Sequence, residues 1–273
     1  MNNAIEKGEN KMKLSISNIA WNLENDKVMY KYIQNSGFQG IEIAPTRIFP
    51  VSPYEDLKQA NHFANMLNDK YGLIISSMQS IWYGKSENIF KSQEERKILI
   101  DYTKKAIDFA SLIKCRNIVF GCPKNRVINN ERDIDIAISF FKELGEYANS
   151  KNTALSIEPN PTIYNTNFIN TTDEAFKLVK LIDSEGVMVN IDLGTIICNN
   201  EDLSIIKENV NLVNHIHISE PYLVLIKKRS IHKELADLLK ESKYEKFISI
   251  EMGKCDDIEE VKNTIIYINE VFR

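Results

Sequence analysis

Eight short runs rich in apolar and β-branched residues recur along this chain, and an amphipathic stretch of helical length follows almost every one. The runs are residues 13–17, 40–44, 73–78, 117–121, 154–158, 187–192, 212–219 and 247–251. Short apolar strands that alternate with helices are typical of a parallel sheet covered by helices. Eight such repeats predict an α/β fold, a single (β/α)₈ TIM barrel.

An open, doubly wound parallel sheet is the alternative arrangement of the same repeats. Such a sheet usually carries a glycine-rich phosphate-binding turn after its first strand. Here the first strand is followed by SNIAWNLEND, which contains no glycine, and the whole chain has only 10 glycines. The closed barrel is therefore the favoured fold.

The chain of 273 residues has no linker-like change of composition after its first dozen residues. We expect residues 1–12, which are mostly polar, to form a disordered N-terminal lead-in, and residues 13–273 to form one catalytic barrel. Four motifs with the spacing of a helix cap support the expected helices, and the least certain helix lies near 201–208. These motifs are Ser52-Pro53-Tyr54-Glu55, Ser92 with Glu95, Thr171 with Glu174, and Asp256 with Glu259.

The net charge of −4 and the isoelectric point near 5.7 argue against binding to nucleic acid, which usually requires a basic face. No apolar run is long enough to span a bilayer, and the N-terminus lacks the apolar core of a signal peptide. The four cysteines form no CxxC pair and are expected to be free thiols. Together these features predict a cytoplasmic protein without nucleic-acid or membrane partners.

A side chain able to bind a metal stands at or near the end of each of the last four strands. These residues are Glu158, Asp192, His217 and Glu251. In a TIM barrel the C-terminal ends of all strands meet at one face, so the four side chains should converge there. Three converging carboxylates repel one another, and a divalent cation relieves that repulsion. Oxygen and nitrogen ligands suit Mn²⁺, Mg²⁺, Co²⁺ or Zn²⁺.

An ion-pair network without a metal is the alternative for these four residues. No Lys or Arg lies within the strand ends to neutralise the carboxylates, although Lys254 stands in a nearby loop. We therefore predict a site for one divalent metal ion.

Other polar residues on the strands are expected to lie inside the barrel near this site. His215 alternates with His217 and should point inward, where it would support the ligands. Glu42 alternates with isoleucines on the second strand, so it should also point inward and support the site or bind substrate. Glu220 could orient a ligand or contact substrate. The two other histidines lie in helical stretches and are expected at the surface: His62 and His232.

The loops on the same face hold residues suited to a sugar substrate. Trp21 and Trp82 follow the first and third strands, where aromatic rings can pack on the apolar face of a sugar. Arg47 follows the second strand and could bind an anionic group. Further candidates of these two kinds are Tyr83, Lys124, Arg126, Lys227, Lys228, Arg229 and Lys254. Whether the substrate carries a phosphate or carboxylate is left open by the sequence.

The chain resembles the sugar phosphate isomerase/epimerase superfamily of xylose isomerase-like TIM barrels, over nearly its whole length from about Met12. The likeness rests on Glu158-Pro-Asn-Pro, Asp192-Leu-Gly, His215-Ile-His217-Ile-Ser-Glu220, Ile250-Glu251 and GFQGIEI at 37–43. By motif, the chain is most similar to ketose 3-epimerases of the tagatose/psicose type, and also to hydroxypyruvate isomerase and inosose dehydratase.

The resemblance implies that Glu158, Asp192, His217 and Glu251 hold one divalent metal ion. It also implies that Glu158 and Glu251 exchange protons with the substrate from opposite faces. The metal would polarise the substrate carbonyl and stabilise an enediolate. These roles predict an isomerase or epimerase of a small sugar or sugar phosphate, and they are compatible with a homo-oligomer.

The chain departs from the epimerase pattern at two positions that contact substrate in those enzymes. Thr195 stands where they have a histidine, and Leu223 stands where they have an arginine. Thr195 is here expected to support the metal ligands. A metal-dependent dehydratase of a keto-polyol such as an inosose, and a non-catalytic sugar-binding barrel, are therefore alternatives. Endonuclease IV, of the same superfamily, needs more histidines than the 4 in this chain.

Overall fold

The computed structural model describes residues 12–130 and 133–273, and within them eight parallel strands form a closed barrel. Each strand pairs with the next one in sequence, and β8 pairs with β1 to close the ring. The predicted single TIM barrel is therefore confirmed, and the open sheet is excluded. The strands are β1 (Lys13–Ser17), β2 (Gly40–Ile43), β3 (Ile74–Met78), β4 (Asn117–Phe120), β5 (Ala154–Ile157), β6 (Val187–Asp192), β7 (Val213–Ile218) and β8 (Phe247–Ile250).

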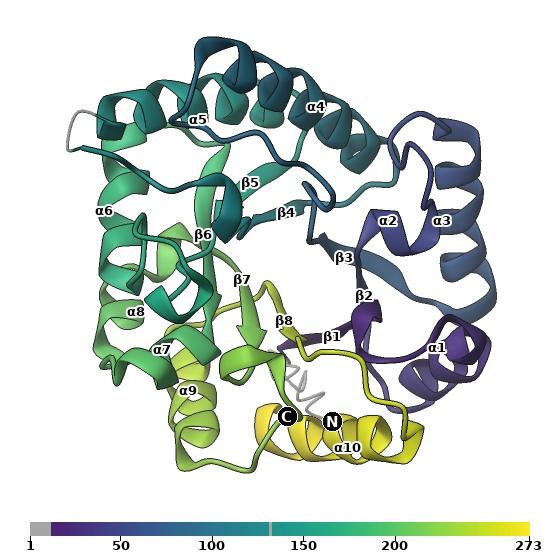
Figure 1. Cartoon of the computed structure of the whole chain (residues 1–273). Coiled ribbons are helices and arrows are strands. Elements are labelled where there is room, and N and C mark those ends of the chain that lie inside the picture. Colours follow the sequence, from purple (N-terminus) through teal and green to yellow (C-terminus); the bar gives the residue numbers. More distant parts are fainter. Residues whose placement is uncertain (1–11, 131–132) are drawn as a thin grey trace, which may run out of the picture.

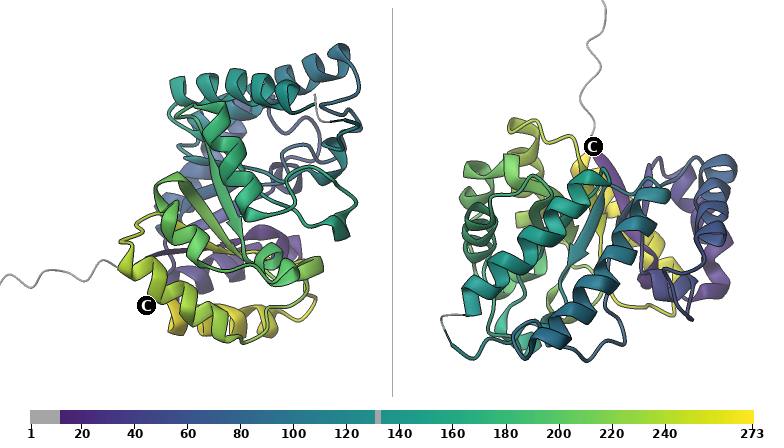
Figure 2. Two further views of the ribbon diagram at one scale, coloured as in Figure 1. Left: turned by 90° about the vertical axis from the view of Figure 1, so that its left-hand side faces the viewer. Right: turned by 90° about the horizontal axis from the view of Figure 1, so that it is seen from above.

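Helices surround the barrel, as Figure 1 and both views of Figure 2 show. The longer ones are α1 (Asp26–Asn35), α3 (Leu57–Tyr71), α4 (Gln93–Leu112), α5 (Asp133–Ser150), α6 (Thr172–Ile182), α9 (Ser230–Glu241) and α10 (Ile258–Phe272). Three short helices lie in the connections: α2 (Pro45–Ile48), α7 (Leu193–Asn199) and α8 (Ser204–Glu208). The helix expected near 201–208 forms only as the short α8. Among the described residues, no helix combines the length and hydropathy required to cross a membrane.

Two of the four predicted helix caps are present. The hydroxyl of Ser92 accepts the backbone N–H of Glu95 at 3.1 Å and begins α4. Thr171 and Glu174 form a reciprocal capping box at the start of α6. Each cap satisfies backbone donors that the first turn of a helix leaves without an internal acceptor.

The other two predicted caps are wrong. Ser52 lies in a turn with a φ of 51°, and α3 begins only at Leu57. There the carboxylate of Asp56 accepts the N–H of Gln59 at 2.9 Å. In α10 the capping residue is Asp257 in place of Asp256, and its carboxylate accepts the N–H of Glu259 at 2.9 Å. In both cases a neighbouring aspartate provides the acceptor, because Asp caps a helix as well as Ser does.

The predicted lead-in lies outside the described residues, except for Met12, which is buried against the core. The four cysteines are free, as expected. The apolar core lies between the barrel and the helices, where strand residues such as Leu14, Ile41, Leu155 and Ile216 are fully buried.

The inside of the barrel is polar. Alternate strand residues point inward, and these are largely Ser, Asn, Glu and His, where TIM barrels usually have Val, Ile and Leu. They bond across the interior: Asn117 Nδ2 donates to Ser77 at 2.8 Å, and the Ser156 hydroxyl donates to Asn117 Oδ1. The buried inward-facing set includes Ser15, Ser17, Glu42, Ser77, Asn117, Ser156, Asn190, His215, His217 and Ser249.

The two helical histidines differ in their surroundings. His62 is exposed, as predicted, but the expectation of a surface position for His232 is wrong, because its side chain is fully buried. His232 shares the buried stripe of α9 with Leu235 and Leu239, at helical spacing, and its Nδ1 lies 2.8 Å from Tyr267 Oη. Burial lowers the pKa of His232 to about 4, although the charge of Glu220 acts in the opposite direction.

This buried histidine should make the stability of the protein depend on pH. The unfolded chain binds the proton with a pKa near 6.5, above the folded value of about 4, so stability falls as the pH drops from 6.5 to 4. Between pH 7 and pH 5 the loss attributable to His232 should be about 2 kcal/mol. Urea unfolding at both pH values measures it. His232→Phe should reduce the difference by that amount, and His62→Gln should leave it unchanged. Equal pH dependence in wild type and His232→Phe would contradict the assignment.

Candidate metal centre

The four predicted ligands meet at the C-terminal ends of β5 to β8. Glu158 and Glu251 directly follow β5 and β8, Asp192 ends β6, and His217 is the next-to-last residue of β7. One ligand atom from each residue lies within 4.8 Å of the others, and all four side chains are buried. The register of the sheet produces this meeting, because Asp192 pairs with His217 across β6 and β7.

The spacing of these atoms fits a divalent cation. His217 Nδ1 lies 2.8 Å from Glu158 Oε1 and 3.0 Å from Glu251 Oε2. Neighbouring ligands of an octahedral site with metal distances of about 2.1 Å are themselves about 3.0 Å apart. Among the described residues, no Lys or Arg side chain forms an ion pair with Glu158, Asp192 or Glu251. The donor set therefore offers a cation three carboxylates that have no Lys or Arg partner.

Glu42 determines which nitrogen of His217 faces the carboxylates. Its Oε2 lies 2.9 Å from His217 Nε2, and both side chains are fully buried. A carboxylate that accepts the Nε2–H leaves the Nδ1 lone pair free to bind a metal. In this structure Nδ1 faces Glu158 Oε1 at 2.8 Å and Asn190 Nδ2 at 3.2 Å.

Glu42 is itself contacted by residues of neighbouring parts of the barrel. Gln79, directly after β3, donates from Nε2 to Glu42 Oε1 at 3.1 Å and to Ser17 Oγ at 2.7 Å. His215 Nε2 lies 3.1 Å from Glu42 Oε2, in a charge contact without the alignment of a hydrogen bond. Burial lowers the pKa of His215, even though Glu42 favours its charged form. Among the described residues, His215 thus contacts Glu42 and forms no hydrogen bond or ion pair with the carboxylates of Glu158, Asp192 or Glu251.

Without a cation, the crowded negative charges shift the pKa values of the ligands. Burial and the charge of Glu158 raise the pKa of Asp192, and burial raises the pKa of Glu251. Burial alone would lower the pKa of His217, but the charges of Glu251 and Glu42 outweigh burial and raise this pKa well above its ordinary value. A proton on His217 therefore replaces part of the positive charge that a metal would supply.

Asp192 is fixed at both carboxylate oxygens. The backbone N–H of Thr195 donates to Oδ2 at 2.7 Å, and the Thr195 hydroxyl lies at the same distance from Oδ2. The hydroxyl of Ser219 donates to Oδ1. Thr195 thus lies where the sequence predicts a supporting residue, whereas Ser219 was not predicted.

Glu158 is held as tightly. Asn190 Nδ2 donates to Oε1 at 2.7 Å, and Asn160 Nδ2 donates to Oε2 at 3.2 Å. A Cβ atom at Gly121 would lie 2.7 Å from Oε2, so only glycine leaves space for this carboxylate. These three supporting residues were not predicted from the sequence. A glycine immediately after a buried strand, as at Gly121, could have indicated a close contact at the strand end.

A cavity of about 220 Å³ opens beside the ligands. It is lined by Gln79, Ser80, Val119, Gly121, Cys122, Pro123, Glu158, Asn160, Tyr164, Asp192, Leu223 and Glu251. No lysine or arginine is among these residues. Amide, hydroxyl and apolar groups therefore surround the three carboxylates.

The aromatic and basic residues predicted to bind substrate lie outside this lining. Trp21 is buried, and its Nε1–H donates to Asp26 at 2.8 Å. Arg47 pairs with the same Asp26 at 2.7 Å. Trp82 is also buried and donates to Thr103 at 2.9 Å. Substrate contact by these residues stays a prediction, since nothing in their positions brings them to the cavity.

Glu42 and Glu220, the two acids predicted to contact substrate, are equally engaged elsewhere. Glu42 lies below His217, inside the barrel, in the contacts described above. Glu220 is buried and accepts two hydrogen bonds from Arg229, at 2.6 and 2.7 Å. Arg229 lowers the pKa of Glu220 against the opposing effect of burial, so this acid is ionised near neutral pH.

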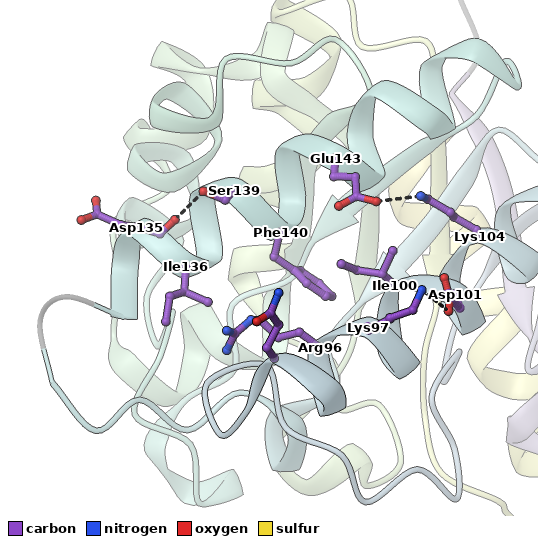
Figure 3. A pocket seen from close by; sticks show the side chains of 11 residues that line it. Arg96, Lys97, Ile100, Asp101, Lys104, Asp135, Ile136, Ser139, Phe140 and Glu143 are labelled. Carbon is purple, nitrogen blue, oxygen red and sulfur yellow. Dashed lines mark hydrogen bonds and ion pairs between the residues drawn. The ribbon is translucent and has the colours of Figure 1, made fainter.

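A larger cavity, of about 610 Å³, lies on the outside of the barrel between α4 and α5 (Figure 3). Its walls carry ordinary surface pairs, such as Lys104 with Glu143 at 2.7 Å. None of the metal-competent clusters found among the described residues lies there. The candidate metal centre therefore lies at the strand ends, beside the smaller cavity.

The family model described as "Xylose isomerase-like TIM barrel" matches residues 30–268. The chain belongs to this family. Among solved structures, it is similar to a 3-keto-D-glucoside 4-epimerase from E. coli, with a TM-score of 0.77, 18% identity, and coverage of 95% of this chain and 100% of that one. No curated protein sequence matches the chain.

Two further structures show the same fold. A D-psicose 3-epimerase from Clostridium cellulolyticum H10 has a TM-score of 0.79 and 15% identity, covering 96% of this chain and 100% of that one. A sugar phosphate isomerase/epimerase from Parabacteroides distasonis ATCC 8503 has a TM-score of 0.71 and 14% identity, covering 97% and 96%. The resemblance to xylose isomerase-like barrels found in the sequence is thus confirmed.

The glycine beside Glu158 provides a test of this centre. Gly121→Ala places a methyl group 2.7 Å from Glu158 Oε2 and should displace that carboxylate. Displacement should weaken Mn²⁺ binding about tenfold or more. Calorimetric titration of chelator-treated protein measures the affinity. Gly72→Ala is the matched control, because it strains a backbone with a φ of 63° but meets no atom within 4 Å. It should lower stability and leave Mn²⁺ affinity unchanged. Wild-type affinity in Gly121→Ala would argue against the geometry described.

Proposed function

We propose that this protein is an enzyme, a divalent-metal-dependent isomerase or epimerase of a small sugar that works through an enediolate. The observation that carries the proposal is the meeting of Glu158, Asp192, His217 and Glu251 beside the cavity. Membership of the xylose isomerase-like family and the printed activities of the structural neighbours support it.

In this proposal the four residues hold one cation, such as Mn²⁺. When bound, the cation supplies the positive charge that polarises the substrate carbonyl and stabilises the enediolate. Glu42 keeps His217 Nδ1 directed at the site, and Thr195 and Ser219 keep Asp192 in place.

Glu158 and Glu251 then move the protons. Both line the cavity, and they enter it from β5 and β8, which two other strands separate. One carboxylate removes a proton from the carbon beside the carbonyl, and the other returns a proton to the enediolate.

The cavity favours an uncharged sugar over a sugar phosphate. Its lining has no basic residue, and two arginines of the surrounding loops have acidic partners: Arg47 has Asp26, and Arg229 has Glu220. A buried phosphate would therefore lack a partner, which is costly. The side-chain oxygens of Gln79, Ser80 and Asn160 can accept hydrogen bonds from hydroxyl groups of a sugar. The volume of about 220 Å³ is below the usual range for drug-sized ligands and suits a single sugar unit.

Solvent isotope exchange tests the reaction. Ketoses and keto-glycosides are incubated with the protein and Mn²⁺ in D₂O, and the products are examined by mass spectrometry and NMR. We expect one deuterium beside the carbonyl of an otherwise unchanged skeleton, and loss of exchange after chelation. The phosphorylated counterpart of the best substrate should have a kcat/KM at least about tenfold lower. An enone absorbing in the ultraviolet would instead indicate a dehydratase, and binding without turnover of any sugar would indicate a sugar-binding barrel.

Amide substitutions test the two proton-transferring residues. Glu158→Gln and Glu251→Gln keep an oxygen that can bind metal but cannot accept the substrate proton, so kcat should fall by about 10²- to 10⁴-fold. Inductively coupled plasma mass spectrometry should show that Glu251→Gln retains metal, whereas Asp192→Ala and His217→Ala should lose it. Glu55→Gln, at an exposed carboxylate paired with Lys105, is the control and should retain kcat. A near-normal kcat in Glu251→Gln would contradict the proposed role of Glu251 in proton transfer.

A further inference from the structure

Arg126 is a fully buried arginine that lies one amide group away from Glu158. It follows the short turn Pro123–Asn125 after β4, and its side chain has no solvent exposure. Its Nη2 donates to Asn160 Oδ1 at 2.7 Å. Its Nε and Nη1 have no hydrogen-bond partner within the described part of the chain. A buried cation with so few partners is costly, and its position needs a reason beyond packing.

Arg126 fixes the orientation of the Asn160 amide. A guanidinium group has only donors, so the amide must turn its oxygen Oδ1 toward Arg126. The amide nitrogen Nδ2 then faces the other way and donates to Glu158 Oε2 at 3.2 Å. Nδ2 also donates to the Pro159 carbonyl at 3.1 Å, so Arg126 and Pro159 both act on the amide. Without Arg126 the amide loses the donor that holds Oδ1, and a turned amide would place its oxygen against the carboxylate oxygen and repel it.

The charge of Arg126 also offsets part of the negative charge of the ligand set. Glu158, Asp192 and Glu251 together carry a charge of −3, and buried Glu42 beside His217 adds a fourth negative charge, so a divalent cation leaves −2. Burial lowers the pKa of Arg126 to about 10, so the guanidinium remains protonated at neutral pH. The charge of Glu158 acts on Arg126 in the direction that keeps the proton. Arg126 therefore places one buried positive charge near a set of carboxylates that a divalent cation alone does not neutralise.

We propose that Arg126 is a positioning residue that acts through Asn160 to hold the Glu158 carboxylate in the orientation required for metal binding and proton transfer. It touches neither the cavity nor the ligand atoms. The inference rests on the proposed function, because it explains the buried position of Arg126 by the needs of the metal centre.

The test compares the Mn²⁺ affinity of chelator-treated Arg126→Met, Asn160→Leu and the double variant, measured from the electron paramagnetic resonance signal of free Mn²⁺. Each single variant should bind Mn²⁺ about 10- to 100-fold more weakly than wild type. The double variant should be no weaker than the weaker single variant, because the two residues act as one unit. Arg126→Lys should recover part of the affinity, since an ammonium group can also donate to Oδ1.

Arg96→Met is the matched control, because Arg96 is a half-buried arginine that donates to the Ile89 carbonyl on the outside of the barrel. It should keep wild-type affinity. Thermal unfolding of the chelator-treated proteins separates loss of metal affinity from loss of fold, and Arg126→Lys, whose affinity should lie below that of the wild type, carries the test if Arg126→Met does not fold. Wild-type affinity in Arg126→Met, or additive losses in the double variant, would overturn the inference alone. Absence of Mn²⁺ binding by the wild type would overturn the proposed function.

Discussion

The imidazole of His217 lies between Glu42 on one side and the carboxylates of the metal centre on the other, and the arrangement of the site depends on it. Its Nε2 faces Glu42 at 2.9 Å, and its Nδ1 faces Glu158 at 2.8 Å. Four buried carboxylates therefore surround one ring, directly or through a neighbour. Negative charges this close to one another are unstable without a compensating cation or proton. The geometry of the barrel thus creates a requirement for positive charge at a single point, and that point adjoins the cavity.

The barrel interior is specialised for this charge. Ser, Asn and Gln side chains replace the branched apolar residues that usually fill a TIM barrel, and they hold the carboxylates through hydrogen bonds. Stability must then come mainly from the apolar layer between the strands and the outer helices, where Leu14, Ile41 and Leu155 are fully buried. The fold separates the two tasks: the outward faces of the strands support the structure, and the inward faces support the site.

The loops after β5, β7 and β8 are joined over the cavity. Tyr222 N–H donates to Tyr164 Oη at 2.8 Å, and Gly253 N–H donates to the Leu223 carbonyl at 2.7 Å. Tyr222 and Leu223 both have positive φ values, of 62° and 52°, which cost about 1–2 kcal/mol per residue. This strained turn brings Leu223 into the cavity lining.

The sequence by itself determined the barrel and the identity of the four converging residues. Strand periodicity, and the placement of a ligand at a strand end, are local properties that the chain displays directly. Only the tertiary structure decided what holds those residues. Asn190 lies 32 positions from Glu158, and Glu42 lies 175 positions from His217, so no local pattern pairs them. For the same reason, the sequence did not show that Arg126 and Gly121 lie close to Glu158, or that Trp21 and Arg47 lie outside the cavity. Hydrogen-bond partners are chosen by the register and closure of the barrel, which bring distant strands together.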